Sequence, residues 1–130
     1  MTGRSPLRSL WLWTPAIVYL GIIYGLSAQS QVGWARAYPD WILHGLEYGG
    51  LAILLARALG GGIRRLLSEA CLALAWTLSA AYAVSDEIHQ SYVPGRSSDW
   101  RDVLADVLGA ALALALLRLA QARLARFLPA

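Results

Sequence analysis

Side chains that can transfer protons or bind an ion are concentrated in three short stretches of the 130-residue sequence. They are His44 and Glu47; Asp86, Glu87 and His89; and Asp99, Asp102 and Asp106. Most neighbours within a stretch stand three or four residues apart, so on an α-helix they would line one face. Carboxylates and imidazoles are the usual general acids and bases of enzymes. The spacing therefore predicts a polar stripe on each of three helices.

Arg96 is the residue best suited to hold an anion. It follows Pro94 and Gly95, a pair typical of turns, in the segment between the second and third stretches. A planar guanidinium can donate two parallel hydrogen bonds to a phosphate or a carboxylate, and Gly95 lets the backbone come close to a ligand. The alternative is a structural turn in which Arg96 pairs with Asp99 or Asp102. Both interpretations are open at the level of sequence.

Metal binding and nucleophilic catalysis are less well supported by the residue spacing. A metal site is conceivable from the following residues: His44, Glu47, Asp86, His89 and Asp102. No motif of fixed spacing such as His-Glu-x-x-His is present, so neither a metal ion nor another cofactor is predicted. A serine nucleophile would have to come from Ser27, Ser97 or Ser98, but no Gly-x-Ser-x-Gly segment accompanies them. Ser97 or Ser98 is instead predicted to cap the following helix.

The elements that must position these side chains are predicted to be transmembrane helices. Hydrophobic residues make up 58% of the chain and charged residues only 15%, against roughly 25% in an ordinary soluble domain. Apolar stretches cover residues 10–27, 41–59, 67–84 and 103–119, each close to the ~20 residues that a helix needs to cross a bilayer. Short connections make sequence neighbours antiparallel. We expect an all-α, integral membrane four-helix bundle that forms a single domain over residues 1–130.

The arginines predict the orientation of this bundle. All eleven basic residues are arginines near the ends of the apolar stretches, a pattern typical of membrane topology rather than of nucleic-acid binding. One side carries Arg4, Arg8, Arg57, Arg64, Arg65, Arg118, Arg123 and Arg126, and the other carries Arg36, Arg96 and Arg101. Positive charge favours the cytoplasmic side. Both termini are therefore predicted to be cytoplasmic, in a multi-pass protein of the inner (plasma) membrane, with the ionisable stretches at the outer end.

The polar stripes are predicted to face the interior of the bundle. Glu47 and Asp106 would lie roughly 7–9 Å inside the outer boundary, given a rise of ~1.5 Å per residue. An acid at this depth is unfavourable unless it meets a partner or water. Below Asp106 the same face continues through Gly109, Ala110 and Ala113, small residues that let helices approach closely. An alternative to a functional site is that these polar groups only hold the helices together.

The sequence resembles the VanZ-like family, whose pattern is Asp-Glu-x-x-Gln, then Pro-Gly-Arg, then Asp-x-x-x-Asn/Asp-x-x-Gly. The matching residues are Asp86, Glu87, Gln90, Pro94, Gly95, Arg96, Asp102, Asp106 and Gly109. Residues 26–30 and the pair His44 and Tyr48 are weaker matches, and together the resemblance covers most of the chain. Asp106 is a departure, because the family more often has Asn at this position, so a shared charge state is not implied there.

The resemblance implies a membrane fold more specifically than it implies a reaction. It also names the expected core of the site: Asp86, Glu87, Gln90, Arg96 and Asp102. The family takes its name from a protein linked to resistance to the glycopeptide antibiotic teicoplanin. A role in the cell envelope is therefore implied.

Two classes of function follow from these residues. The first is a membrane enzyme acting on a lipid-linked or cell-envelope substrate, with Asp86 or Glu87 as base, His89 or His44 as proton carrier and Arg96 as anion anchor. The second is a non-catalytic protein that binds or moves an amphiphile, or an accessory subunit whose acids are structural. Four short helices enclose little volume, so lipid, a second copy of the chain or a larger membrane complex could complete the site.

The predicted site is divided by role. The catalytic candidates are Asp86, Glu87, His89 and Asp102. The substrate-binding candidates are His44, Glu47, Gln90, Arg96, Asp99 and Asp106. The expected partner is an anionic membrane lipid or a lipid-linked envelope precursor.

Overall fold

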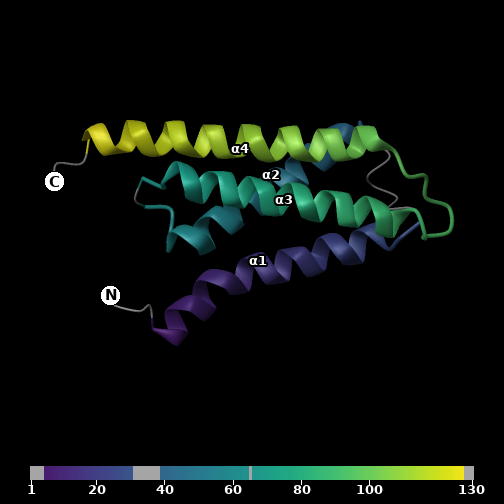
Figure 1. The fold of residues 1–130 in the computed structure, drawn as a ribbon, viewed down its shortest axis with the longest axis horizontal. Coiled ribbons are helices and arrows are strands. Elements are labelled where there is room, and N and C mark those ends of the chain that lie inside the picture. The colour runs from purple at the N-terminus through teal and green to yellow at the C-terminus, as the bar shows by residue number, and fades with distance from the viewer. Residues whose placement is uncertain (1–4, 31–38, 65, 128–130) are drawn as a thin grey trace.

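The computed structural model describes residues 5–30, 39–64 and 66–127, the last without its side chain, and these residues form four helices without a strand. The helices are α1 (Pro6–Ser27), α2 (Asp40–Gly60), α3 (Glu69–Gln90) and α4 (Trp100–Phe127). Consecutive helices run in opposite directions, so α1 and α3 run one way and α2 and α4 the other (Figure 1). The start of α1 and the end of α4 lie at the same end of the bundle. The predicted all-α, four-helix fold is confirmed.

In the described part of the chain, three helices are long and apolar enough to cross a membrane, namely α1, α2 and α4. The third helix has a similar length but is less apolar, because it contains Glu69, Asp86 and Glu87. The outer face of the bundle remains apolar, and leucines of α4 such as Leu108 and Leu112 are exposed there. This exposed apolar surface is what hydrocarbon would cover in a bilayer.

The helices extend beyond the apolar stretches that predicted them. α4 was expected over residues 103–119 but runs from Trp100 to Phe127, since Arg and Gln are good helix formers outside the apolar region. Ser5 precedes α1, and its side chain accepts a hydrogen bond from the backbone of Arg8. α3 begins two residues later than expected because Ser68 caps it. The predicted orientation also used Arg4, Arg36 and Arg65, which lie outside the described residues.

Small residues bring α2 and α4 into close contact along parallel axes. A Cβ atom at Gly109 would overlap the backbone of Gly45, and one at Gly49 would lie 3.2 Å from the Cβ of Ala113. Each helix thus contributes two small residues four positions apart, the arrangement by which membrane helices let their backbones approach. The prediction that Gly109 and Ala113 lie at a close helix contact is confirmed, and the most extensive helix packing in the bundle is between these two helices.

A proline within α1 is compensated by an arginine from α2. Pro15 has no N–H, so the carbonyl of Trp11 cannot receive its usual hydrogen bond from this position. Arg57 Nη1 instead donates to the carbonyl oxygens of Leu12 at 2.8 Å and Trp11 at 3.3 Å. The guanidinium also lies 5.8 Å from the centroid of the Trp11 ring, a cation–π arrangement. This contact fixes the first half of α1 against the bundle.

We expect an Arg57→Met substitution to lower the free energy of unfolding by about 2 kcal/mol, because charge-assisted bonds to two carbonyls are lost. Methionine keeps much of the aliphatic contact, so the effect isolates the guanidinium. Thermal unfolding in detergent measures the change. Arg123→Met is the matched control, since Arg123 is exposed on α4. Equal melting curves for the two variants would show that the hydrogen bonds from Arg57 to the carbonyls of α1 do not contribute to stability.

Candidate functional site

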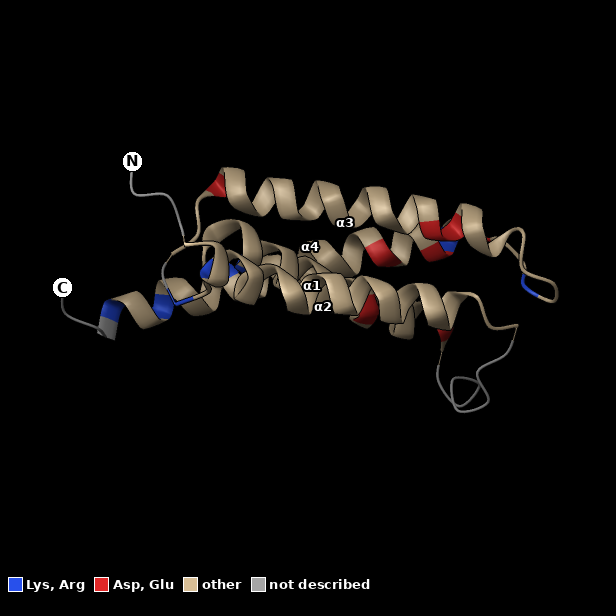
Figure 2. Ribbon diagram, turned by 90° about the horizontal axis from the view of Figure 1, so that it is seen from below, with Lys and Arg blue, Asp and Glu red and all other residues tan. Residues whose placement is uncertain are grey.

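Most acidic residues of the described chain, with Glu69 at the start of α3 as the exception, lie toward one end of the bundle (Figure 2). This is the end where α1 and α3 finish and where α2 and α4 begin. Arg96 and Arg101 lie at the same end, whereas Arg57 and Arg118 lie in the opposite half, where Arg118 Nη2 pairs with Glu69 Oε1 at 2.8 Å. The convergence expected from helical spacing is therefore present. Two separate polar networks make up this end.

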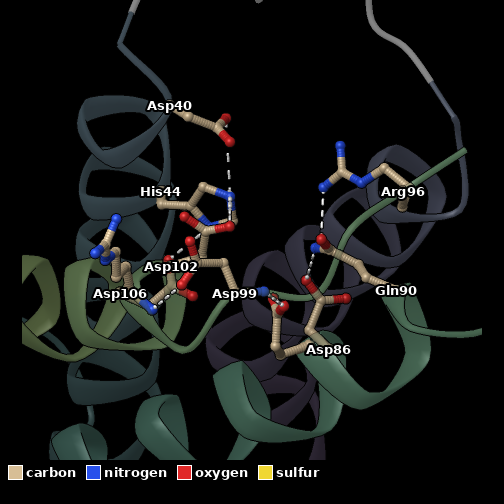
Figure 3. A network of polar contacts seen from close by, with 10 residues as sticks. Asp40, His44, Asp86, Gln90, Arg96, Asp99, Asp102 and Asp106 are labelled. Atoms are coloured by element: carbon tan, nitrogen blue, oxygen red, sulfur yellow. Dashed lines mark hydrogen bonds and ion pairs between the residues drawn. The ribbon is translucent and has the colours of Figure 1, made fainter.

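The first network joins α2 to α4 through His44, and we call Asp40, His44, Asp102 and Asp106 the histidine cluster (Figure 3). His44 Nδ1 lies 3.0 Å from Asp106 Oδ1, within hydrogen-bond distance. The other ring nitrogen, Nε2, lies 3.9 Å from Asp40 Oδ1 and 4.0 Å from Asp102 Oδ2. His44 and Asp106 are both buried, whereas Asp40 is exposed. Packing of α2 on α4 thus creates a buried imidazole facing three carboxylates.

The second network is a chain of three side chains along the end of α3. Arg96 Nη2 donates to Gln90 Oε1 at 2.6 Å, and Gln90 Nε2 donates to Asp86 Oδ2 at 3.0 Å. Gln90 and Asp86 are buried, and Arg96 is half-buried. In the described part of the chain Arg96 has no ion pair, so the alternative in which it pairs with Asp99 or Asp102 is not observed. A neutral amide therefore holds the guanidinium in place.

Glu87 ties the loop after α3 to the start of α4. Its Oε1 accepts a hydrogen bond of 2.5 Å from the backbone N–H of Asp99. Asp99 Oδ1 in turn accepts from the N–H of Arg101 at 2.9 Å, so Asp99 occupies the capping position of α4. The prediction that Ser97 or Ser98 caps this helix is wrong, because the carboxylate stands directly before the first helical residue. Glu87 therefore positions the loop that carries Arg96.

His89 lies on the opposite side of the α3 end, against α1. Its Nδ1 is 3.2 Å from Ser27 Oγ, and its ring stacks on that of Tyr24 with centroids 4.5 Å apart. The pair is reminiscent of a nucleophile and base, but Ser27 Oγ also lies 3.1 Å from the carbonyl of Tyr24. Among the described residues no carboxylate pairs with His89. The third group of a catalytic triad is therefore lacking here.

A cavity of about 410 Å³ connects the two networks. One part of its lining is polar and consists of Ser27, Asp40, His44, Glu47, Asp86, Gln90 and Arg96. The other part consists of Tyr19, Ile22, Leu26, Leu43 and Leu46. Helices α1, α2 and α3 and the loop that carries Arg96 all contribute, so the cavity is lined by both polar and apolar side chains.

The cavity separates the predicted site residues into two groups. Those that line it are His44, Glu47, Asp86, Gln90 and Arg96. Those that do not line it are Glu87, His89, Asp99, Asp102 and Asp106, which contact the lining residues or the loop. Asp40 lines the cavity but was not among the predictions. Its position four residues before His44 on one helix face was the signal that could have identified it.

Comparison with known proteins supports the family resemblance seen in the sequence. The model of the family described as VanZ/LLP1 matches residues 8–121, a range that reaches from α1 into α4 and includes both networks. No curated protein and no solved structure matches the chain. Because the family model covers most of the chain, this membrane protein belongs to the VanZ/LLP1 family.

Proposed function

We propose that this protein is a multi-pass protein of the cytoplasmic membrane that binds the anionic headgroup of a lipid or lipid-linked cell-envelope precursor. The observation that carries the proposal is the cavity lined by both polar and apolar side chains, with Arg96 among the polar ones. An amphiphile has the same division, because a charged headgroup is joined to hydrocarbon. A ligand whose headgroup contacts the polar side chains and whose first methylene groups contact the apolar side chains would match both parts of the lining.

Arg96 supplies the positive charge that an anionic headgroup needs. Nη2 donates to Gln90, while Nε and Nη1 have no hydrogen bond within the described residues, so donors remain for a ligand. A guanidinium fits phosphate and carboxylate oxygens through paired hydrogen bonds. Gln90 and Asp86 fix the orientation of the side chain, and Glu87 fixes the loop. The anion anchor is thus held in place before a ligand arrives.

The position of the cavity along the bundle agrees with a headgroup site. Trp41 and Trp100 stand at the start of α2 and α4 and are 65% and 69% exposed. Exposed tryptophans at helix ends are typical of the membrane interface, where headgroups lie. The excess of arginine at the opposite end supports an outward-facing cavity. The link of the VanZ family to resistance to the glycopeptide teicoplanin suits a protein that acts on this side of the envelope.

The test replaces Arg96 without changing the cavity shape greatly. Arg96→Gln is expected to weaken binding of a soluble short-chain anionic phospholipid about 10–100-fold, the effect of losing charge-assisted hydrogen bonds worth about 1.5–3 kcal/mol. Affinity is measured with dioctanoyl phosphatidylglycerol and purified protein in a neutral detergent, with dioctanoyl phosphatidylcholine as the zwitterionic comparison. Arg101→Gln is the matched control, because it removes one exposed arginine at the same end.

Two results would contradict a headgroup site at Arg96. One is equal affinity of Arg96→Gln and Arg101→Gln for the anionic lipid. The other is an unchanged affinity when the charged headgroup is replaced by the zwitterionic one. Mass spectrometry of the lipid recovered after incubation distinguishes binding from turnover, since an enzyme would return a chemically altered molecule.

A further inference from the structure

We propose that Asp40, His44 and Asp102 form a binding site for one divalent transition-metal ion beside the cavity. The proposal does not depend on the lipid ligand, because it concerns the metal ion alone. Three groups that can each offer one ligand atom meet here, and these atoms all lie within 4.8 Å of one another. Asp40 and His44 come from adjacent turns of α2, and Asp102 comes from the first turn of α4.

The distances fit ligands of a shared ion better than they fit direct ion pairs. Nε2 of His44 stands 3.9 Å from one carboxylate and 4.0 Å from the other. A protonated nitrogen bonded to either carboxylate would bring it to about 2.7–2.9 Å. In a tetrahedral site with metal–ligand bonds of about 2.1 Å, ligand atoms stand about 3.4 Å apart. Shortening the two distances from His44 Nε2 to about 3.4 Å therefore requires movements of only a few tenths of an ångström on each side, and the three ligand atoms already lie within 4.8 Å of one another.

The orientation of His44 provides a second, independent argument. The side chain is 8% exposed, yet its Nε2 has no hydrogen bond to any described residue and lies between two carboxylates. Asp106 holds the other nitrogen, Nδ1, at 3.0 Å. Histidines that bind metals almost always have the second ring nitrogen held by a carboxylate or a carbonyl, which fixes the tautomer and the ring orientation. Asp106 is placed to serve as that outer carboxylate.

The ligand set indicates the class of ion. One imidazole and two carboxylates suit zinc, manganese or iron, whereas magnesium and calcium prefer all-oxygen coordination. Asp40 is exposed and also lines the cavity, so an ion could enter without opening the bundle. Three protein ligands leave at least one coordination position for water or for an oxygen atom of a molecule in the cavity.

Zinc binding by the purified, chelator-treated full chain in detergent tests the proposal. We expect one Zn²⁺ per chain, measured by competition with a fluorescent chelator, and no displacement by about a hundredfold excess of Mg²⁺. Asp40→Asn is expected to weaken Zn²⁺ binding at least about tenfold, and Asp102→Asn similarly, because each removes one ligand. Asp40→Asn is the more decisive of the two variants, since an exposed side chain at the start of α2 can be substituted without unfolding the bundle.

Matched controls separate this site from adventitious binding to surface groups. Glu69→Gln removes an exposed acid from the first turn of α3, as Asp40→Asn does from the first turn of α2, and should leave Zn²⁺ affinity unchanged. His89→Gln should likewise bind as the unaltered chain does, whereas His44→Gln should lose stoichiometric binding. The proposal fails if the unaltered chain takes up no stoichiometric Zn²⁺, or if Asp40→Asn and Asp102→Asn bind as tightly as Glu69→Gln.

Discussion

A Gly109→Val substitution is expected to destabilise the bundle by about 3 kcal/mol, at the upper end of what overpacking usually costs. The reason is that the space beside Gly109 is filled by backbone rather than by a movable side chain. Even a single Cβ atom would overlap the backbone of Gly45. Valine can be accommodated only if α4 moves away from α2, and this movement would also separate Asp106 from His44.

The measurement is the midpoint of thermal or denaturant-induced unfolding in detergent. Gly25→Val is the matched control, because nothing lies within 4 Å of a Cβ atom at Gly25 in α1. We expect the control to change stability by no more than about 0.5 kcal/mol, as for a typical surface substitution. If Gly109→Val and Gly25→Val had the same unfolding midpoint, the close contact between α2 and α4 would be contradicted.

The second large effect is expected at Asp106. An Asp106→Leu substitution should lower the free energy of unfolding by about 3–5 kcal/mol, because it leaves the buried ring of His44 without its partner. Asp106→Asn should cost only about 1–2 kcal/mol, since the amide oxygen can still accept a hydrogen bond from Nδ1. Aspartate is 3% exposed at this position, so water cannot replace the lost partner.

The comparison of these two substitutions separates charge from hydrogen bonding. Unfolding midpoints that fall in the order of the unaltered chain, then Asn, then Leu would show that the hydrogen bond is the main contribution. Asn as destabilising as Leu would show that the negative charge itself is required.

Much of the fold could be predicted from the sequence because it depends on local and one-dimensional patterns. Four apolar stretches predicted four helices, and short connections predicted that sequence neighbours are antiparallel. Helical periodicity placed His44 and Asp106 on inward faces, where they meet. The ends of the helices were less predictable, since a helix can extend beyond its apolar stretch into polar sequence. The first residue of α3 and of α4 is set by a capping residue, Ser68 and Asp99 respectively.

The roles of individual site residues could not be predicted, because they depend on contacts between elements. Glu87 stands next to Asp86 in sequence, yet it bonds a loop backbone while Asp86 lines the cavity. Arg96 donates a hydrogen bond to Gln90 rather than to an acid, because the loop folds back on α3 and brings these two side chains together. His44 meets Asp102 and Asp106 only because α2 packs on α4.

The parallel packing of α2 on α4 has a consequence for how the protein is made. Parallel neighbours cannot be joined by a short turn, so α3 must lie between them in sequence. α4, which is synthesised after the other three helices of the bundle, therefore supplies the partner of His44 and half of the glycine contact. Until α4 is synthesised, His44 lacks the carboxylate that it meets in the folded bundle. The contact between α2 and α4 can therefore form only after all four helices of the bundle have been synthesised.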